Sequence, residues 1–222
     1  MKNACMILIA VLLALPFPAA RAGDDDGWTL KKSGNGIVIY LRDMPGSRTK
    51  QFRAVMRVPG ARLSSLMAVF DDAASYPRWM HHCIEARVVK KISASERMTY
   101  SATEAPWPVS TRDMVTHSLV RQDPKSLTVT LTIRAVPDML PPVNGRVRIR
   151  KLDAVWTFRP EGNGDVTVVY QLHSEPGGSL PPGLANMAVT DLPFNTFIKL
   201  RNIIKEEKYA MARFPQITEP SR

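Results

Sequence analysis

Arg112 and Asp113 form the adjacent pair of opposite charges most able to act at a buried site. They lie where a strand is predicted to begin, over residues 113–121. Successive side chains on a strand point to opposite faces, so only one of the two can face a cavity. A buried charge needs a partner, so an inward Arg or Asp marks either a ligand contact or a structural ion pair. Both interpretations stay open, since the pair could also anchor the edge of the strand.

Metal and catalytic signatures are sparse. The run His81-His82-Cys83 is the most metal-like, but neighbouring side chains diverge in extended structure and no CxxC or HxxxH spacing accompanies it. We therefore predict a polar connection between a helix and a strand there, with no metal site and no cofactor. The GxSxG elbow, the phosphate-binding Walker loop and the HExxH motif are all absent. We predict that the chain is not an enzyme.

Apolar residues at strand and helix spacing suggest the wall of a cavity. Trp156 and Phe158 share one face of a predicted strand with Leu152 and Ala154. Eleven methionines suit a deformable interior, although ordinary core packing is the alternative for each of them. A ligand site needs such apolar walls and a few polar groups. The candidate ligand-binding residues are Arg112, Asp113, Met114, Trp156, Phe158, Leu184, Met187, Asp191 and Phe194.

A proline-rich loop at 137–145 carries Met139 and Leu140. Large apolar residues such as these are uncommon at the exposed tip of a loop. We expect these two residues to close a cavity mouth or to enter a membrane surface. The basic run 146–151 follows, and Arg146 and Arg148 could bind anionic headgroups there. The alternatives are a loop packed on the last helix and a solvated, charged strand edge.

These residues must be positioned by a mixed set of elements. Alternation and turn residues predict strands over 37–42, 50–58, 85–92, 97–103, 113–121, 126–136, 146–159 and 165–173. Helical spacing predicts helices over 63–72, 75–79 and 184–214. Pro193 should bend or break the last of them. Residues 28–32 are predicted to form the end of another short helix. The order predicts an α+β fold: one domain over residues 23–215 and a frayed tail over 216–222.

The N-terminus reads as a secretory signal over residues 1–22. Lys2 precedes an uncharged apolar run, and Ala20-Arg21-Ala22 predicts cleavage after Ala22. We expect a periplasmic or secreted protein, with a membrane anchor as the alternative. Cleavage would remove Cys5 and leave Cys83 without an intrachain partner. The net charge of +10 favours anionic membrane surfaces, and export argues against nucleic acid as a partner.

Several short motifs together resemble the START (steroidogenic acute regulatory-related lipid transfer) domain family, from about Trp28 to Phe214. They are Trp28 with Gly-Ile-Val-Ile-Tyr at 36–40, Tyr-Pro-Arg-Trp at 76–79, Trp-Pro-Val at 107–109 before Arg-Asp at 112–113, and residues 178–186. The resemblance implies a helix-grip fold, in which a curved antiparallel sheet wraps a long C-terminal helix around an internal tunnel. The family's ligands include sterols, phospholipids and ceramides. Ser118 stands where cholesterol-binding members carry an Arg, which weakens a sterol assignment.

We therefore expect one hydrophobic ligand, a lipid, to be bound in a mostly dry tunnel with few polar groups and to be carried or transferred. Related helix-grip families include cyclases and hydrolases. The alternative is thus a cavity enzyme acting on an apolar substrate, with His117, His173 or Asp191 as its acid or base.

Overall fold

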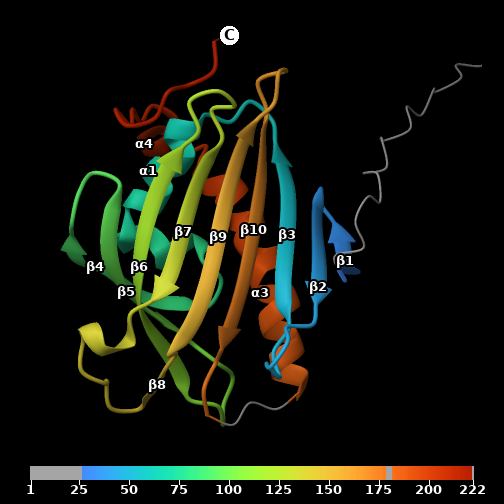
Figure 1. Ribbon diagram of the computed structural model, residues 1–222, viewed down its shortest axis with the longest axis vertical. Helices are drawn as coiled ribbons and strands as arrows, with labels where there is room; N and C mark the ends of the chain where they lie inside the picture. The colour runs from blue at the N-terminus through green and yellow to red at the C-terminus, as the bar shows by residue number, and fades with distance from the viewer. Residues whose placement is uncertain (1–26, 179–181, 222) are drawn as a thin grey trace, which may run out of the picture.

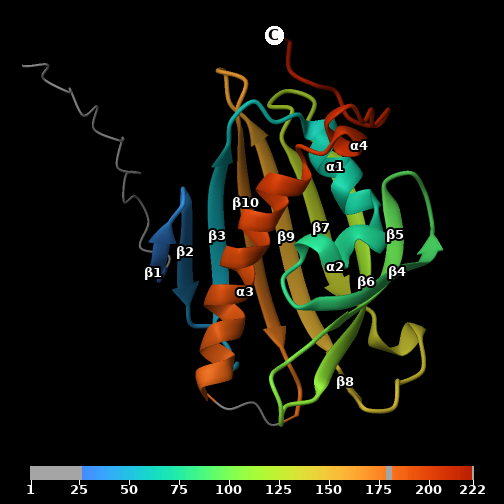
Figure 2. The same cartoon turned by 180° about the vertical axis from the view of Figure 1, so that it is seen from behind.

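Ten strands form one curved sheet that wraps around helix α3, which lies behind the sheet in Figure 1 and in front of it in Figure 2. The computed structural model describes residues 27–178 and 182–221, with the side chains of 182–188 outside this description; the expected signal, 1–22, lies outside the described residues. The strands are β1 (Thr29–Gly34), β2 (Ile37–Arg42), β3 (Gln51–Val58), β4 (Cys83–Lys91), β5 (Glu96–Thr103), β6 (Thr111–Gln122), β7 (Val129–Ala135), β8 (Arg146–Arg148), β9 (Lys151–Pro160) and β10 (Val166–Glu175).

The strand order is β1-β2-β3-β10-β9-β7-β6-β5-β4, and neighbours along this path are antiparallel. The short strand β8 lies off the path and pairs with β6 in parallel. The helices are α1 (Leu63–Asp71), α2 (Tyr76–Trp79), α3 (Pro182–Ile203) and α4 (Glu207–Ala210), with 3-10 turns η1 (Ala73–Ser75) and η2 (Pro137–Met139). The expected α+β helix-grip architecture is confirmed.

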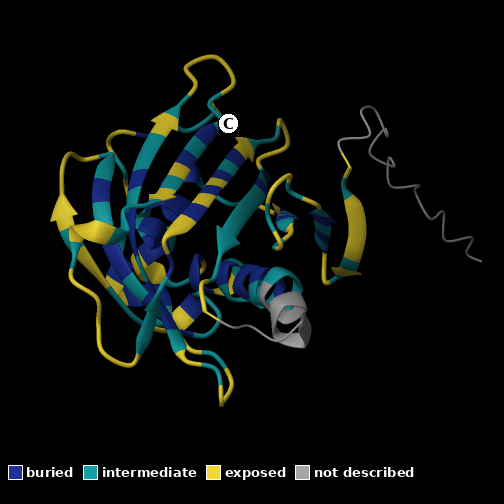
Figure 3. Cartoon of the chain, turned by 60° about the horizontal axis from the view of Figure 1, so that its bottom comes forward, coloured by how far each residue is buried: buried dark blue, intermediate teal, exposed yellow. Residues whose placement is uncertain are grey.

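Alternation along the strands separates the two faces of the sheet. In β3, Phe52, Ala54, Met56 and Val58 are buried, while the residues between them are at least partly exposed. Figure 3 shows the same pattern as dark-blue bands along the central strands. Because side chains alternate across a strand, the apolar set covers the concave face and meets the helices.

The core centres on an aromatic cluster around Trp156. Its ring stacks on Tyr170 with the centroids 3.8 Å apart, and it meets the edges of Phe70 at 4.9 Å and Phe197 at 5.5 Å. These contacts join β9 to β10, α1 and α3. Phe197 and Leu200 are fully buried, so the C-terminal half of α3 packs tightly on the sheet.

Local interpretations near the N-terminus and in the last helix were partly wrong. Residues 29–34 form a strand, because β1 pairs with β2 across the Asn35-Gly36 turn. Trp28 lies under the guanidinium groups of Arg42 and Arg53, 4.5 and 4.2 Å from its ring centroid, so tertiary contacts fix this segment. Pro193 lies inside α3 and does not end it, since packing on the sheet outweighs the local cost of about 3 kcal/mol.

The other differences arise from contacts distant in sequence. Helix α3 ends at Ile203, and a separate α4 follows. Residues 146–159 form two strands, β8 and β9, and not one. The expected frayed tail is wrong for its described part: Ile217 is buried, and Glu219 accepts hydrogen bonds from the backbone N–H groups of Leu63 (3.0 Å) and Ser64 (2.7 Å). This carboxylate satisfies donors at the start of α1, where negative charge is favoured. Among the described helices, none is long and apolar enough to cross a bilayer.

Candidate ligand-binding cavity

A cavity of about 1080 Å³ lies between the concave face of the sheet and helix α3. Strands β3, β5, β6, β7, β9 and β10 supply its walls, and α3 covers it through Val189, Leu192, Pro193 and Thr196. The segment after α2 contributes Met80, His81 and His82. The hollow expected between the sheet and the terminal helix is therefore present.

One part of the wall is apolar. Trp156 and Ala154 on β9 face the cavity, and so do Tyr170 and Leu172 on β10. Leu131, Ile133, Leu152, Phe52 and Leu192 extend this surface. Burial raises the pKa of Tyr170, so its hydroxyl stays neutral. These residues offer a surface suited to an apolar chain or ring system.

The part of the cavity wall on β5 and β6 is polar. Their inward residues form four cross-strand pairs, and all eight line the cavity: Arg97 with Ser118, Thr99 with Thr116, Ser101 with Met114, and Thr103 with Arg112. The expectation of very few polar groups inside is therefore wrong. The alternation of Arg, Thr, Ser and Thr at 97, 99, 101 and 103 was the signal that could have revealed this wall.

Three of the predicted ligand residues face the cavity: Arg112, Met114 and Trp156. Burial lowers the pKa of Arg112, whose guanidinium also donates to the carbonyl of Ser110 at 2.6 Å. The other members of the predicted set for which side chains are described do not line it. The side chains of Leu184 and Met187 lie outside the described residues.

The remaining candidates have structural partners. Asp191 accepts a hydrogen bond from the ammonium of Lys32 at 2.6 Å, and this ammonium lies 4.3 Å from the ring centroid of Phe194. Phe158 is fully buried against the edge of Phe70, with centroids 5.4 Å apart. Asp191 and Phe194 thus join α3 to β1, and Phe158 belongs to the aromatic core.

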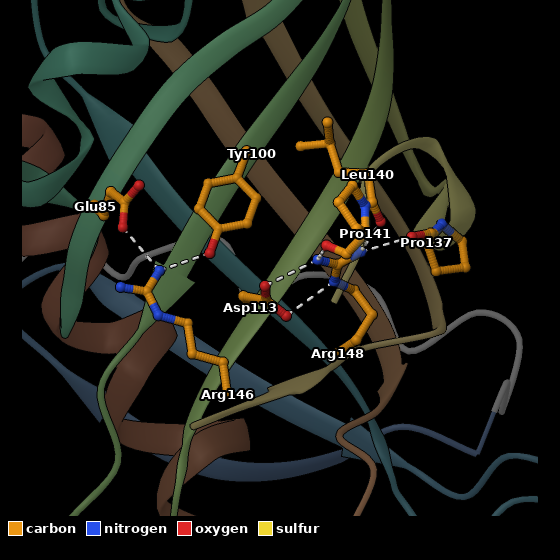
Figure 4. A network of polar contacts seen from close by, with 8 residues as sticks. All are labelled: Glu85, Tyr100, Asp113, Pro137, Leu140, Pro141, Arg146 and Arg148. Atoms are coloured by element: carbon orange, nitrogen blue, oxygen red, sulfur yellow. Dashed lines mark hydrogen bonds and ion pairs between the residues drawn. The ribbon is translucent and has the colours of Figure 1, made fainter. Parts of the chain in front are cut away.

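Asp113 points to the outer face of the sheet, where Arg148 binds it with two hydrogen bonds of 2.9 and 3.0 Å (Figure 4). The Asp113 side chain is 1% exposed and that of Arg148 is 7% exposed. Burial opposes ionisation of Asp113, but the hydrogen bonds and charge of Arg148 outweigh it, and the pKa of the carboxyl falls below its ordinary value. The Arg-Asp pair therefore divides: Arg112 faces the cavity, and Asp113 holds β8.

The predicted gate residues belong to the same network. Arg148 also donates to the carbonyls of Pro137 (2.6 Å) and Leu140 (2.9 Å), which fastens the 137–145 loop outside the sheet. Arg146 donates to Glu85 at 2.7 Å and to the hydroxyl of Tyr100 at 2.6 Å. Met139 is 41% exposed. No residue from 137 to 148 lines the cavity, so this loop does not form part of its described wall.

Three loops that supplied none of the predicted site residues line the cavity. They are residues 46–50 between β2 and β3, 104–106 after β5, and 176–178 after β10. Trp107 follows the second of these and is 92% exposed. Figure 2 places the ends of β5 and β10 at the lower end of the molecule, away from α1 and α4.

The candidate acids and bases do not reach the cavity. His117 pairs with Glu96 at 2.6 Å, His173 bonds the hydroxyls of Ser47 (3.0 Å) and Thr49 (3.2 Å), and Asp191 is held by Lys32. His81 and His82 do line it, with ring centroids 4.2 Å apart, and burial lowers the pKa of His81. Burial also raises the pKa of the neighbouring Cys83 thiol to about 11. The described residues contain no cluster of three potential metal ligands.

Removing one partner of the Asp113–Arg148 pair should destabilise the fold strongly. We expect Asp113→Asn to lower the free energy of unfolding by about 3 to 5 kcal/mol at pH 7, because a buried guanidinium loses its counter-charge. Asp153→Asn, in the exposed pair with Arg134 at 3.5 Å, serves as the control and should cost under about 1 kcal/mol.

This difference should depend on pH. The pKa of Asp113 is lowered in the folded state, so the pair's contribution is complete above the unfolded pKa of roughly 4 and is lost as pH falls through the lowered value. The cost of Asp113→Asn should therefore shrink in acid. Urea unfolding at neutral and acidic pH measures the loss of unfolding free energy caused by Asp113→Asn. An identical loss at both pH values would contradict a lowered pKa of Asp113 in the folded state.

The comparisons with known proteins agree with this geometry. Residues 17–207 match the family model described as the START domain. An uncharacterised protein of Pseudomonas aeruginosa is 34% identical over 197 residues, covering 89% of this chain and 96% of that protein.

Solved structures show the same fold. A STAR-related lipid transfer protein of Xanthomonas axonopodis (fragment 25–204) gives a TM-score of 0.75 at 36% identity, covering 82% of this chain and all of that one. Human StAR-related lipid transfer protein 5 gives 0.69 at 19% identity, covering 82% and 88%, and supports the fold alone. Since the family model matches most of the sequence, the chain belongs to the START domain family.

Proposed function

We propose that this protein binds one lipid in the cavity beneath α3 and transfers it between membranes. The observation that carries the proposal is the hollow of about 1080 Å³ with a continuous apolar surface on β7, β9 and β10. Burial of a lipid's apolar area there supplies roughly 25 cal/mol per Å², less the cost of ordering the ligand. The Xanthomonas relative, named as a lipid transfer protein, supports the same function.

We propose a carrier and not an enzyme. His117, His173 and Asp191 are engaged by other side chains outside the cavity wall. A general acid or base must reach the reacting atom, and these three groups do not face the space where a substrate would lie.

Purified protein should retain extractable lipid, and filling the cavity should remove it. Ala154→Trp places a large ring into the cavity from β9, so the retained lipid per molecule should fall sharply. Val155→Trp is the matched control, because Val155 is on the opposite face of β9 and is 37% exposed. Solvent extraction with mass spectrometry measures the lipid. Equal retention by the two variants would exclude this cavity as the site.

We also propose that the end of the cavity bordered by the loops 46–50 and 104–106, here called the mouth, docks on an anionic membrane through Trp107. This side chain is 92% exposed beside the loop 104–106, which lines the cavity. Exposed Arg48 and Lys50 belong to another loop at the cavity. Indole side chains favour the interface between headgroups and acyl chains, and basic residues near it are attracted to anionic lipid. Arg146 and Arg148, in contrast, are engaged inside the protein.

Trp107→Ala should weaken binding to vesicles of phosphatidylcholine and phosphatidylserine by about 10-fold, because the protein loses its largest exposed apolar contact. Lipid retained per molecule should not change. Met211→Ala is the control: Met211 is 74% exposed but follows α4, at the other end of the molecule. Vesicle co-sedimentation at low salt measures binding, and equal losses in both variants would argue against docking at the mouth.

We propose, finally, that residues 1–22 direct export to the periplasm or outside the cell. The positive Lys2, the apolar run and the small residues at 20 and 22 support this proposal. The first residue of protein recovered from its own cells should be Gly23. A chain that still begins at Met1, or that stays with the membrane after a salt wash, would contradict cleavage.

A further inference from the structure

The ladder of hydroxyl groups along β5 and β6 restricts what the cavity can hold. Five side chains form this hydroxyl wall: Thr99, Ser101, Thr103, Thr116 and Ser118. They lie on the same inward face, in cross-strand rows that extend from Arg97–Ser118 to Thr103–Arg112. Six residue steps separate the first row from the last, so the wall is about 20 Å long.

The protein itself satisfies these hydroxyls poorly. Thr116 donates to the carbonyl of Thr99 and Ser118 to that of Arg97, both at 3.4 Å, which is long for an O–H donor. Within the described part of the chain, the side chains of Thr99, Ser101 and Thr103 make no hydrogen bond. Each hydroxyl carries one donor and two acceptor sites, so the wall has unused capacity directed at the ligand.

Arg97, at one end of the wall, has its partners elsewhere. It forms an ion pair with Asp71 and donates to the carbonyl of Phe70 at 2.8 Å, at the C-terminal end of α1. Arg112, at the other end of the wall, also faces the cavity, and its guanidinium donates to the carbonyl of Ser110 at 2.6 Å. Between these two charged ends, the hydrogen-bonding side chains of the wall are hydroxyls, which are neutral. A wall of neutral donors and acceptors matches hydroxyl, ester or amide groups on a ligand.

A lipid with a single headgroup does not match this wall. Its headgroup would reach one end, and its apolar chain would cover the remaining hydroxyls and remove their water. Each hydroxyl left without a partner lowers affinity by roughly 5- to 100-fold. The apolar residues of the cavity lie mainly on β7, β9 and β10, where Leu131, Trp156 and Tyr170 offer contacts to an apolar ligand surface.

We infer that the ligand is a facially amphipathic lipid, with several hydrogen-bonding groups spread along one side and an apolar opposite side. This inference rests on the proposed lipid-binding function and specifies its ligand. The polar side lies on the hydroxyl wall, and the apolar side lies against Trp156, Tyr170 and Leu172.

A ligand series with one skeleton tests the inference on the full chain. The probes are 5β-cholanate, lithocholate, deoxycholate and cholate, which carry zero to three hydroxyls on the same ring system with the same carboxylate. Titration below their micellar concentrations, followed by tryptophan fluorescence and by calorimetry, gives the dissociation constants. We expect affinity to rise by about 3- to 10-fold for each hydroxyl that finds a partner. Hydrophobicity alone predicts the opposite order.

A paired substitution in the wall provides the matching variant. Thr99→Val with Thr116→Val keeps the shape of one cross-strand row and removes its hydroxyls, so the preference for cholate over 5β-cholanate should fall by about 10-fold. Thr132→Val is the control: Thr132 donates to the carbonyl of Leu119 at 3.4 Å, as Thr116 does to Thr99, but from an exposed position outside the cavity. It should leave the whole series unchanged.

The outcomes separate the two proposals. If 5β-cholanate binds most tightly and the paired variant keeps that order, the hydroxyls are served by retained water, and this inference is overturned while lipid binding stands. If none of the probes binds and the purified protein holds no lipid, both proposals fail. If the paired variant does not fold, the order of affinities in the unchanged protein decides alone.

Discussion

The hollow depends on the aromatic contacts that fix α3 to the sheet at one end. Trp156 contacts Phe70 of α1, Tyr170 of β10 and Phe197 of α3, and so ties together elements from both ends of the chain. Phe197 and Leu200 are fully buried, whereas Val189 and Leu192, nearer the N-terminus of α3, line the cavity. The end of α3 with Phe197 and Leu200 is therefore packed as core, whereas the segment with Val189 and Leu192 covers an open space.

A second constraint keeps the opposite side of the sheet in place. Asp113 and Arg112 are neighbours, and the pleat sends them to different faces, so the same short segment serves the cavity and the outer network. Arg148 uses its planar guanidinium to bind one carboxylate and several loop carbonyls at once, which a lysine could not do. The loop with Met139 and Leu140 is thus held against the sheet, and the cavity is bordered by other loops.

The sequence predicted best what depends on local periodicity. Alternation in β3 and β9 located the buried faces of these strands, and helical spacing located the last helix. The sequence analysis failed where a contact with a residue distant in sequence determines the local structure. Residues 29–34 form a strand because β2 lies alongside, and Glu219 is ordered by the free N–H groups of α1. Asp191 likewise pairs with Lys32, 159 positions away, a contact that no spacing rule predicts.

The polar wall was missed for a different reason: Thr and Ser on a strand read as solvent-facing or neutral, because a packed core seldom tolerates them without partners. The proposed carrier function, however, requires the protein to persist both empty and loaded. A wholly apolar hollow of about 1080 Å³ would be dry when empty, and its walls would lose contacts that collapse could restore. Hydroxyls on β5 and β6 have donor and acceptor sites for water, and bound water would favour an open cavity over collapse. A ligand that replaces this water group for group gains the apolar contacts without leaving the hydroxyls unsatisfied. Under the proposed function, the same wall would therefore favour an open empty cavity and select the molecule that fills it.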